Sequence, residues 1–582
     1  MQFQLGRQRR HKSWKHSLLC TLTLALSWGT AIPATFAAET VTIRLGPFQQ
    51  SVAIADLEKF AKTGNLPDNL QIFSSILTPQ IRELLTKRLE INPAVADKFV
   101  EELKQNPAGK QFISSLSAII PGSSAESLQA TLNLALRQVN GLSALGFLRA
   151  YPEQNVTVDA SEAVSVALEL NPNYWQSQLF GSVLSRQEAA KNSILLPTKF
   201  NPATPGKQTV QQQTFTLQDR QRNRIIPVDI YWSDDNAQNP MVVISHGFGA
   251  NRQFLKYLAH HLASYGITVA AIEHPGSNVT AISRASNQAN LNRLLPATEF
   301  IDRPKDISFA LNELAKLNNQ PGQLQGEFNT NQVTVIGHSL GGYTALALLG
   351  AEVDLQQLRQ FCKNSLGIGQ AAGDWLQCAA ASLPERKLQL KDERVKSAIA
   401  LNPLIGDLFD RNGLSRVKKP VLILTGTEDP LTPALKHQIT PFSNLGGEKY
   451  LLSAVGGTHL SISDPNYQSS DTTTIVKELR GEQTKALRQL LQGVSLAFIK
   501  QQTSEAKTYQ PFLTPAYAQS FSTSSLPLSL VSELPENLKP WVKGDSPEET
   551  LRVDASAASH RVRGSEKGER RKGATDANLQ TK

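Results

Sequence analysis

The sequence predicts an α/β fold, in which a mainly parallel sheet carries helices on both faces and a mostly helical domain precedes it. Between residues 241 and 426, short runs of β-branched and other apolar residues are typical of strands that are buried on both faces. Helical patterns separate most of these runs, and strands that alternate with helices indicate a parallel sheet. A length of 582 residues is too great for one compact core, so we expect more than one domain.

The N-terminus has the layout of a secretory signal peptide over residues 1–37. A basic segment that ends at Lys15 precedes the apolar run of residues 18–32, and Pro33 and small residues follow, with cleavage after Ala37. This run is shorter than the roughly 20 residues that a membrane-spanning helix needs. We therefore expect export to the periplasm or the cell exterior.

Residues 39–193 predict a mostly helical N-terminal domain, because apolar residues recur three and four positions apart in several segments. Two β-like pieces, at 39–45 and 155–161, bracket most of this region, and whether they pair is open. Residues 194–207 are rich in Pro, Gly, Thr and Lys and predict a linker.

Residues 208–506 predict the α/β domain, which begins with a strand pair at 213–219 and 225–233. An insertion at 352–393 is a candidate cap over a pocket. After the α/β domain, residues 507–582 show no periodicity and predict a low-complexity, disordered tail.

The formal net charge of +9 lies at the two ends of the chain. The first 38 residues carry five basic and no acidic side chains, and residues 561–582 carry seven basic and three acidic ones, so 5 + (7 − 3) = 9. The body is therefore close to neutral, and a nucleic-acid partner is not expected. Since no cluster of His, Cys and carboxylates has metal-ligand spacing, neither a metal nor another cofactor is expected.

Two cysteines remain after the signal peptide, Cys362 and Cys378, and both lie in the insertion. In an oxidising compartment they are able to form one disulfide, and two unpaired buried thiols are the alternative.

The stretch VTVIGHSLGGYTALAL, residues 333–348, places Ser339 between a buried strand and a helix. Gly337 and Gly341 leave room for a tight turn on either side of it. A serine raised on such a turn at the carboxyl end of a parallel strand is typical of a catalytic nucleophile. A serine that only caps the helix would not require these glycines.

A serine nucleophile requires a base, and among the ten histidines we expect His459. In this type of fold the base follows the nucleophile and the acid along the chain, which leaves His437 and His459. His437 lies in a helical segment, whereas His459 lies in a Gly-Gly-Thr-His loop after a strand-like segment.

The carboxylate that orients this base is expected at the end of a strand between Ser339 and His459. Asp429 fits this position, and Glu428 is its neighbour on the same loop. The alternative is that Asp429 only caps a helix that begins near Thr432.

Two backbone N–H groups are expected to stabilise the oxyanion of the reaction. One belongs to Leu340, the residue after the nucleophile, and the other to Phe248 in the HGFG loop after an early strand. The nucleophile, base, acid and oxyanion loop thus occur in the order that a serine hydrolase of this fold requires.

With these motifs the chain resembles α/β-hydrolases of the platelet-activating-factor acetylhydrolase and dienelactone-hydrolase-like group. The resemblance rests on HGFG, GHSLGG, GTEDPLTP and GGTHL and covers about residues 208–500. Residues 39–165 resemble the helical domain that precedes such hydrolases in exported bacterial proteins, notably cyanobacterial ones. The resemblance implies an α/β-hydrolase fold and an esterase or lipase-like activity, similar to that of 1-alkyl-2-acetylglycerophosphocholine esterases.

The chain departs from this group at two positions. Dienelactone hydrolases usually carry cysteine where this chain has Ser339. Acetylhydrolases place the acid after the strand that follows the elbow helix, and here that strand ends at Asn402, whose amide cannot stabilise an imidazolium as a carboxylate does. Asp429 is therefore the expected acid, and Asp407 is the fallback.

The expected function is hydrolysis of a carboxylic ester, with a small-molecule ester or lipid as substrate. Transfer of the acyl group to an alcohol, and a binding module with a decayed site, stay open as alternatives. The acyl chain length, the oligomeric state and peripheral contact with a membrane or the cell envelope are not determined by the sequence.

Overall fold

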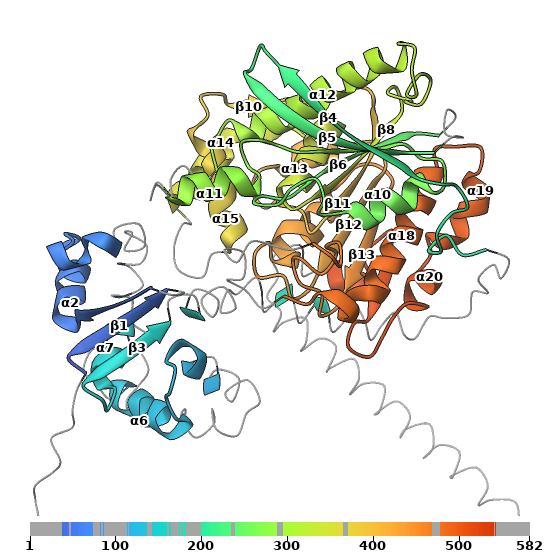
Figure 1. Ribbon diagram of the computed structural model, residues 1–582. Coiled ribbons are helices and arrows are strands. Elements are labelled where there is room, and N and C mark those ends of the chain that lie inside the picture. Colours follow the sequence, from blue (N-terminus) through green and yellow to red (C-terminus); the bar gives the residue numbers. More distant parts are fainter. Residues whose placement is uncertain are drawn as a thin grey trace, which may run out of the picture. The chain divides into compact units, whose positions relative to one another are not determined.

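A computed structural model provides the structure of this chain (Figure 1). It describes residues 38–45, 48–73, 113–114, 116–136, 143–159, 200–233, 239–287, 295–364, 371–467 and 478–539, with isolated positions at 82, 85, 162–163, 174, 176–177, 180–181 and 542. The predicted signal peptide, most of the helical segments predicted between 77 and 112, and residues 543–582 of the predicted tail lie outside the described residues.

The chain forms two compact units, and the first comprises residues 1–163. Its described part contains a three-stranded sheet in the order β2-β1-β3 besides the predicted helices. The hairpin β1–β2 is antiparallel, and β1 pairs in parallel with β3, so the two β-like pieces do pair. Its elements are β1 (Thr40–Leu45), β2 (Phe48–Ala53), α2 (Ile54–Thr63), η1 (Asp68–Phe73), α6 (Ala125–Leu136), α7 (Ala144–Ala150) and β3 (Asn155–Asp159).

The boundary between the units corrects the prediction of an N-terminal domain that extends to residue 193. The second unit already begins at Val164. Phe180 is fully buried in the core of the second unit, and the hydroxyl of Ser177 accepts a hydrogen bond of 2.9 Å from the N–H of Leu435. Helical periodicity is the same for a helix of either unit, so the sequence pattern did not show to which unit a helical segment belongs.

The second unit is built on a nine-stranded sheet in the order β14-β13-β12-β11-β8-β6-β7-β5-β4. The pairs from β7 to β13 are parallel, whereas β4–β5, β5–β7 and β13–β14 are antiparallel. The strands are β4 (Gln211–Asp219), β5 (Arg224–Trp232), β6 (Met241–Ser245), β7 (Val269–Ile272), β8 (Val333–His338), β11 (Val395–Leu401), β12 (Val421–Gly426), β13 (Lys449–Ala454) and β14 (Leu528–Val531). This arrangement is the predicted α/β-hydrolase fold.

Helices cover both faces of this sheet, as predicted (Figure 1). In β6, Met241 and Val243 join one apolar cluster, and Val242 and Ile244 join the other, because successive side chains of a strand point to opposite faces. The first cluster includes α12 (Glu299–Asn318), α13 (Leu340–Leu349) and α14 (Leu355–Asn364), and the second includes α10 (Lys256–Ala263), α18 (Lys485–Lys500) and α20 (Pro515–Gln519). Burial on both faces explains why the central strands are mostly apolar and show no alternation of polar and apolar residues.

Short elements complete the second unit. They are α11 (Val279–Asn287), β9 (Val353–Asp354), α15 (Ala372–Cys378), η4 (Ala379–Ser382), β10 (Lys387–Leu388), α16 (Arg411–Ser415), η5 (Leu435–Ile439), α17 (Thr440–Asn444), η7 (Gly481–Thr484), α19 (Ala506–Tyr509), η8 (Gln510–Phe512) and η9 (Glu536–Leu538).

The structure corrects the prediction of a disordered tail from residue 507. Residues 507–539 are folded onto the second unit, and β14 forms the edge of the sheet by antiparallel pairing with β13. Phe512 and Tyr517 of this segment are buried in the second apolar cluster of the unit. This segment is rich in Ser, Thr and Pro and contributes only one four-residue strand, so its pattern lacks the periodicity that sequence reasoning requires.

The described part of the predicted linker is also packed rather than free. Gly206 donates its N–H to the hydroxyl of Ser264 at 2.8 Å, and the Pro202 carbonyl lies 2.9 Å from a ring nitrogen of His261. Proline and glycine therefore mark a tight path over the surface of the second unit here, which corrects the prediction of an interdomain linker at these residues.

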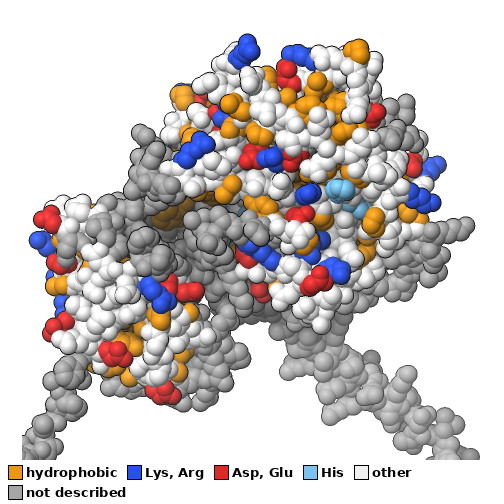
Figure 2. Space-filling model, in the orientation of Figure 1, with side chains coloured by type: hydrophobic (Ala, Val, Ile, Leu, Met, Phe, Trp, Pro, Cys, Tyr) orange, Lys and Arg blue, Asp and Glu red, His pale blue; other side chains and the backbone are white. Residues whose placement is uncertain are grey.

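The insertion at 352–393 contains α14 and α15, which a Cys362–Cys378 disulfide joins with a Cα–Cα distance of 5.7 Å. Acidic and basic side chains are scattered among each other over the visible face of the second unit in Figure 2, in keeping with a nearly neutral body. Among the helices that the structure describes, none combines the length and apolar character that crossing a membrane requires.

Candidate active site

Ser339 lies in the turn between β8 and α13 with φ 53° and ψ −116°, a region that a non-glycine residue rarely occupies. The two flanking glycines are sterically required. A Cβ on Gly337 would lie 1.9 Å from the Gly341 carbonyl oxygen, and a Cβ on Gly341 would lie 2.0 Å from the Ser245 carbonyl oxygen. The side chain of Ser339 makes no capping hydrogen bond to α13, so it does not act as the cap that was the alternative interpretation.

His459 and Asp429 are in direct contact. Nδ1 of the imidazole lies 2.7 Å from Oδ2 of the carboxylate, and both side chains are buried. Since an ionised carboxylate only accepts, Nδ1 carries the hydrogen, and the lone pair of the neutral ring lies on Nε2. Two strands supply the pair, because Asp429 follows β12 and His459 follows β13.

Asp429 also caps the turn that follows it. The residue therefore contacts the imidazole, as expected of the acid, and also caps the chain, as the alternative interpretation proposed. Its Oδ1 accepts from the N–H groups of Leu431 and Thr432 at 2.9 Å each, while Oδ2 accepts from the Thr432 hydroxyl at 2.8 Å. The Thr432 hydroxyl also lies 3.2 Å from Nδ1 of His459. These contacts hold the carboxylate rigidly and leave Oδ2 directed at the imidazole.

The fallback acid, Asp407, lies elsewhere. It forms an ion pair with Lys436 at 3.2 Å, on the side of Asp374 and α15. Glu428, the neighbour of Asp429, has an exposed side chain. Of the three carboxylates that the sequence offered, the structure therefore brings Asp429 alone to His459.

His459 lies beside the serine turn. Its ring centroid is 4.7 Å from that of His338, the residue before Ser339, and Nε2–H of His338 donates to the His459 carbonyl at 3.0 Å. Burial lowers the pKa of His459, but the charge of Asp429 and the hydrogen bond to it outweigh burial, so the pKa is raised above its ordinary value. The charge of the half-buried Glu478 adds to this rise.

The HGFG loop after β6 lies against the serine turn. A Cβ on Gly247 would come within 3.2 Å of the Ser339 Cβ, so glycine allows the close approach. The N–H of Phe248, and that of Leu340 at the start of α13, have no hydrogen-bond acceptor among the described residues. Two free donors beside a serine are what an oxyanion site requires.

His246 orients the peptide that carries the Phe248 N–H. Its Nδ1 lies 2.7 Å from the Gly247 carbonyl oxygen and so donates to it, while Nε2 accepts from the His274 N–H at 3.0 Å. A peptide unit is planar and trans, so fixing the Gly247 carbonyl directs the Phe248 N–H to the opposite side. The sequence argument excluded His246 as a base and did not detect this contact.

A fully buried guanidinium lies behind the same loop. Arg303 of α12 donates to the His246 carbonyl, to the Ser277 hydroxyl at 2.7 Å and to the Ser245 hydroxyl at 3.2 Å. Burial lowers the pKa of Arg303 to about 10, although the charges of Glu299 and Asp306 oppose this. Arg303 and Asp306 lie in the segment DRPKD, residues 302–306, and the sequence argument assigned no role to either residue.

Burial first, and then the charge of Arg303, hold the pKa values of His246 and His274 well below their ordinary range. Nδ1 of His274 donates to Asp306 at 3.0 Å, and two nitrogens of Arg224 bind the same carboxylate at 2.8 and 2.7 Å. The HGFG loop is therefore supported by a network of neutral histidines and buried ion pairs.

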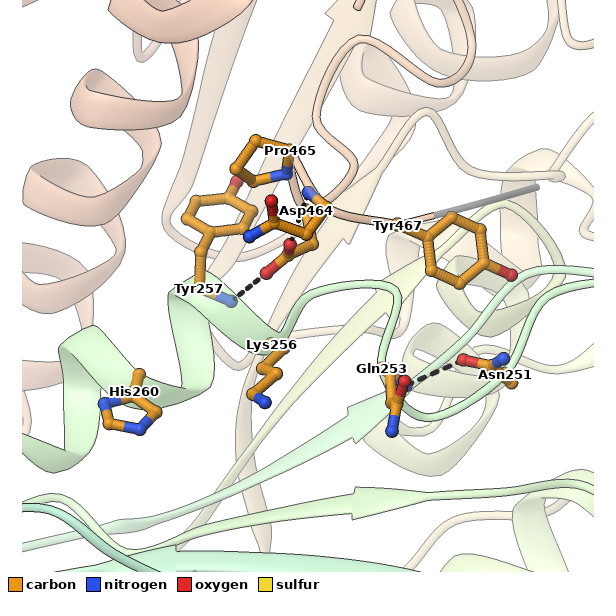
Figure 3. A pocket seen from close by; sticks show the side chains of 9 residues that line it. Asn251, Gln253, Lys256, Tyr257, His260, Asp464, Pro465 and Tyr467 are labelled. Atoms are coloured by element: carbon orange, nitrogen blue, oxygen red, sulfur yellow. Dashed lines mark hydrogen bonds between the residues drawn. The ribbon is translucent and has the colours of Figure 1, made fainter. Parts of the chain in front are cut away.

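A surface cavity of about 510 Å³ lies at the first turn of α10 (Figure 3). Its side chains point apart rather than toward one centre, and Ser339, Asp429 and His459 are not among its lining residues. Among the described residues, no group of three or more His, Cys, Asp or Glu side chains is arranged to bind a metal ion.

Comparisons with known proteins agree with this fold. Residues 231–294, from β5 to beyond α11, match the family described as platelet-activating factor acetylhydrolase, isoform II. Residues 37–159 match the family described as alpha/beta hydrolase of unknown function (DUF1400). The second match falls on the first unit, which does not contain the hydrolase sheet.

Two curated relatives carry the name platelet-activating factor acetylhydrolase. The protein of Canis lupus familiaris is 22% identical over an alignment of 301 residues, and the match covers 46% of this chain and 58% of the dog protein. The protein of Cavia porcellus is 28% identical over an alignment of 140 residues, and the match covers 19% of this chain and 32% of the guinea-pig protein. The matches thus span less than two thirds of either relative, and they support an α/β-hydrolase that is similar to platelet-activating factor acetylhydrolases.

Proposed function

We propose that this chain is an exported serine hydrolase that cleaves a carboxylic ester through Ser339, His459 and Asp429. The observation that carries the proposal is the buried contact of 2.7 Å between His459 and Asp429, beside a serine on a strained turn. A histidine with a raised pKa and a fixed tautomer is what a serine nucleophile needs as its base.

In the proposed acylation step, Nε2 of His459 takes the proton of the Ser339 hydroxyl as its oxygen attacks the ester carbonyl carbon. The imidazolium that forms is stabilised by Asp429, which stays ionised. The carbonyl oxygen becomes an oxyanion and accepts from the N–H groups of Phe248 and Leu340. When the tetrahedral intermediate collapses, His459 returns the proton to the alcohol that leaves.

In the proposed deacylation step, water enters where the alcohol left, and His459 removes its proton. Attack on the acyl-enzyme gives a second tetrahedral intermediate. As it collapses, the bond to the Ser339 oxygen breaks, His459 returns the proton to that oxygen, and the carboxylic acid leaves. The protein's contribution to both steps is the same pair of N–H donors and the same base.

The names of the two curated relatives support the substrate class that we propose. Both curated relatives are named as acetylhydrolases of platelet-activating factor, and we extend this to an ester with an acetyl or short acyl group, such as that of a phospholipid. Export is proposed on the N-terminal signal pattern, and a disulfide between Cys362 and Cys378 suits an oxidising compartment.

The test is turnover of p-nitrophenyl esters from acetate to palmitate by the chain without residues 1–37. We expect a preference for short acyl groups and a loss of turnover in Ser339→Ala, with a fluorophosphonate probe labelling Ser339 of the wild-type chain. Thermal unfolding of the variant serves as the control for folding. Folded wild-type protein that neither turns over an ester nor reacts with the probe would contradict the proposal.

A further inference from the structure

Asn402 occupies an unusual place at the end of β11. It is fully buried and has φ 40°, which lies in the left-handed region that favours glycine. Its N–H donates to the Leu424 carbonyl at 2.9 Å, so the backbone at this strained residue is tied to β12. Such strain in a buried non-glycine residue persists only where its surroundings hold it in place.

The side-chain amide of Asn402 joins three segments. Its Nδ2 donates to the carbonyls of Thr458 and His459 at 3.1 Å each, and its Oδ1 accepts from the Gly426 N–H at 2.9 Å. The amide therefore uses both hydrogens and its oxygen. A carboxylate at this position would face two carbonyl oxygens without a hydrogen to share, so these contacts require an amide.

We propose that Asn402 is a positioning residue that holds the backbone of His459, so that its imidazole stays in register with Asp429 and Ser339. The His459 carbonyl accepts two hydrogen bonds, one from the Asn402 amide and one from Nε2 of His338. Together these two donors hold the backbone of the loop at His459. Asn402 does not itself contact Ser339 or Asp429 by its amide. The inference rests on the proposed function and adds a residue to it.

A competing explanation is that Asn402 is a decayed acid. In the acetylhydrolases that the chain resembles, the acid follows the corresponding strand, and loss of a carboxylate there would leave an amide with no present use. The two explanations predict opposite effects when the carboxylate is restored. Under the positioning role, aspartate at residue 402 breaks two hydrogen bonds and impairs the site.

The experiment compares Asn402→Asp, Asn402→Gly, Asp429→Asn and the double variant Asn402→Asp with Asp429→Asn. Asp and Gly both tolerate the left-handed backbone, so neither change adds strain. We expect kcat to fall about 100-fold in each single variant of Asn402, as for a catalytic group displaced by about 1 Å, while KM stays within about threefold. The double variant should be no more active than Asp429→Asn.

Asn223 supplies a matched control. It also has a left-handed backbone, with φ 52°, but lies exposed in the turn between β4 and β5. Asn223→Asp and Asn223→Gly should leave kcat unchanged. A kcat of Asn402→Asp or Asn402→Gly within twofold of wild type, or a double variant more active than Asp429→Asn, would overturn the positioning role.

A pH titration separates positioning from lost folding. If His459 drifts from Asp429 in Asn402→Gly, the interaction that raises its pKa weakens, and its pKa falls. We expect the pKa of His459, followed by NMR of 15N-histidine-labelled full-length protein and assigned with His459→Gln, to fall in Asn402→Gly. An unchanged pKa in folded protein would contradict the proposal. This titration needs no turnover, so it remains decisive even if the wild-type chain proves inactive and the proposed function fails.

Discussion

The loops on the two sides of Ser339 each contain a buried histidine, but their surroundings carry opposite charge. On the oxyanion side, burial and the guanidinium of Arg303 hold the pKa of His246 well below its ordinary value. On the other side, Asp429 and Glu478 raise the pKa of His459 in spite of its burial. The two side chains are similarly buried, with exposed fractions of 1% and 5%.

The difference follows from what each ring does in the proposed reaction. His246 must keep one tautomer in order to hold the Gly247 carbonyl, so a proton gained on Nε2 would break its bond from the His274 N–H. His459 gains and loses a proton in every cycle, and a base works best when its pKa lies near the working pH. Neighbouring charge rather than residue type thus assigns the two roles.

Replacing each of the two histidines by glutamine should show this difference most strongly. Removal of the base in His459→Gln is expected to lower kcat by about 10⁶-fold, as for loss of a triad histidine. His246→Gln, which disturbs one oxyanion donor, is expected to lower kcat by about 10²- to 10³-fold. Equal losses in the two variants, measured on a short-chain ester with folding checked by circular dichroism, would break the comparison.

Neutralising the acid in Asp429→Asn should lower kcat by about 10⁴-fold, because Nδ1 loses its acceptor. Turnover requires neutral His459, so activity rises with pH through the pKa of this residue. Asp429 raises that pKa, and its removal lowers it, so the acidic limb of the kcat/KM profile should move to lower pH. A limb that stays in place or moves to higher pH would remove Asp429 from its proposed role.

Replacing the buried cation tests the oxyanion side. Arg303→Met should destabilise the fold by about 3–5 kcal/mol, because Glu299 and Asp306 lose a buried countercharge. In the protein that remains folded, kcat should fall by about 10²-fold, because the loop that carries the Phe248 N–H loses a support. Denaturant titration and active-site titration measure the two effects separately, and Arg303→Lys, which keeps the charge, should lose less stability.

The smallest effect is expected at Glu478. This carboxylate accepts from the Leu460 N–H at 2.9 Å and from the Thr458 hydroxyl, but it does not contact the His459 ring. Its charge raises the pKa of His459, so Glu478→Gln should shift the acidic limb to lower pH by less than Asp429→Asn does. If the acidic limb shifts further in Glu478→Gln than in Asp429→Asn, then Glu478, and not Asp429, makes the larger contribution to the pKa of His459.

Local patterns in the sequence predicted much of this arrangement. Apolar strands that alternate with helical segments predict a sheet covered on both faces, and glycines around Ser339 predict a tight turn, because steric demands of the backbone act between neighbours in the chain. Chain order then restricted the base to His437 and His459, the loop position favoured His459, and Asp429 was the carboxylate at a strand end. The same reasoning missed β14, since a four-residue strand carries too little pattern.

The sequence by itself determined the fold class, the serine turn and the residues from which an acid and a base must come, because these depend on local periodicity and local sterics. Only the tertiary structure decided that Asp429 rather than Asp407 contacts His459, and that Asn402, His246 and Arg303 hold the loops around Ser339. These contacts join residues that lie far apart in the chain. Their hydrogen bonds and charges depend on how the strands are ordered in the sheet, which no local pattern records.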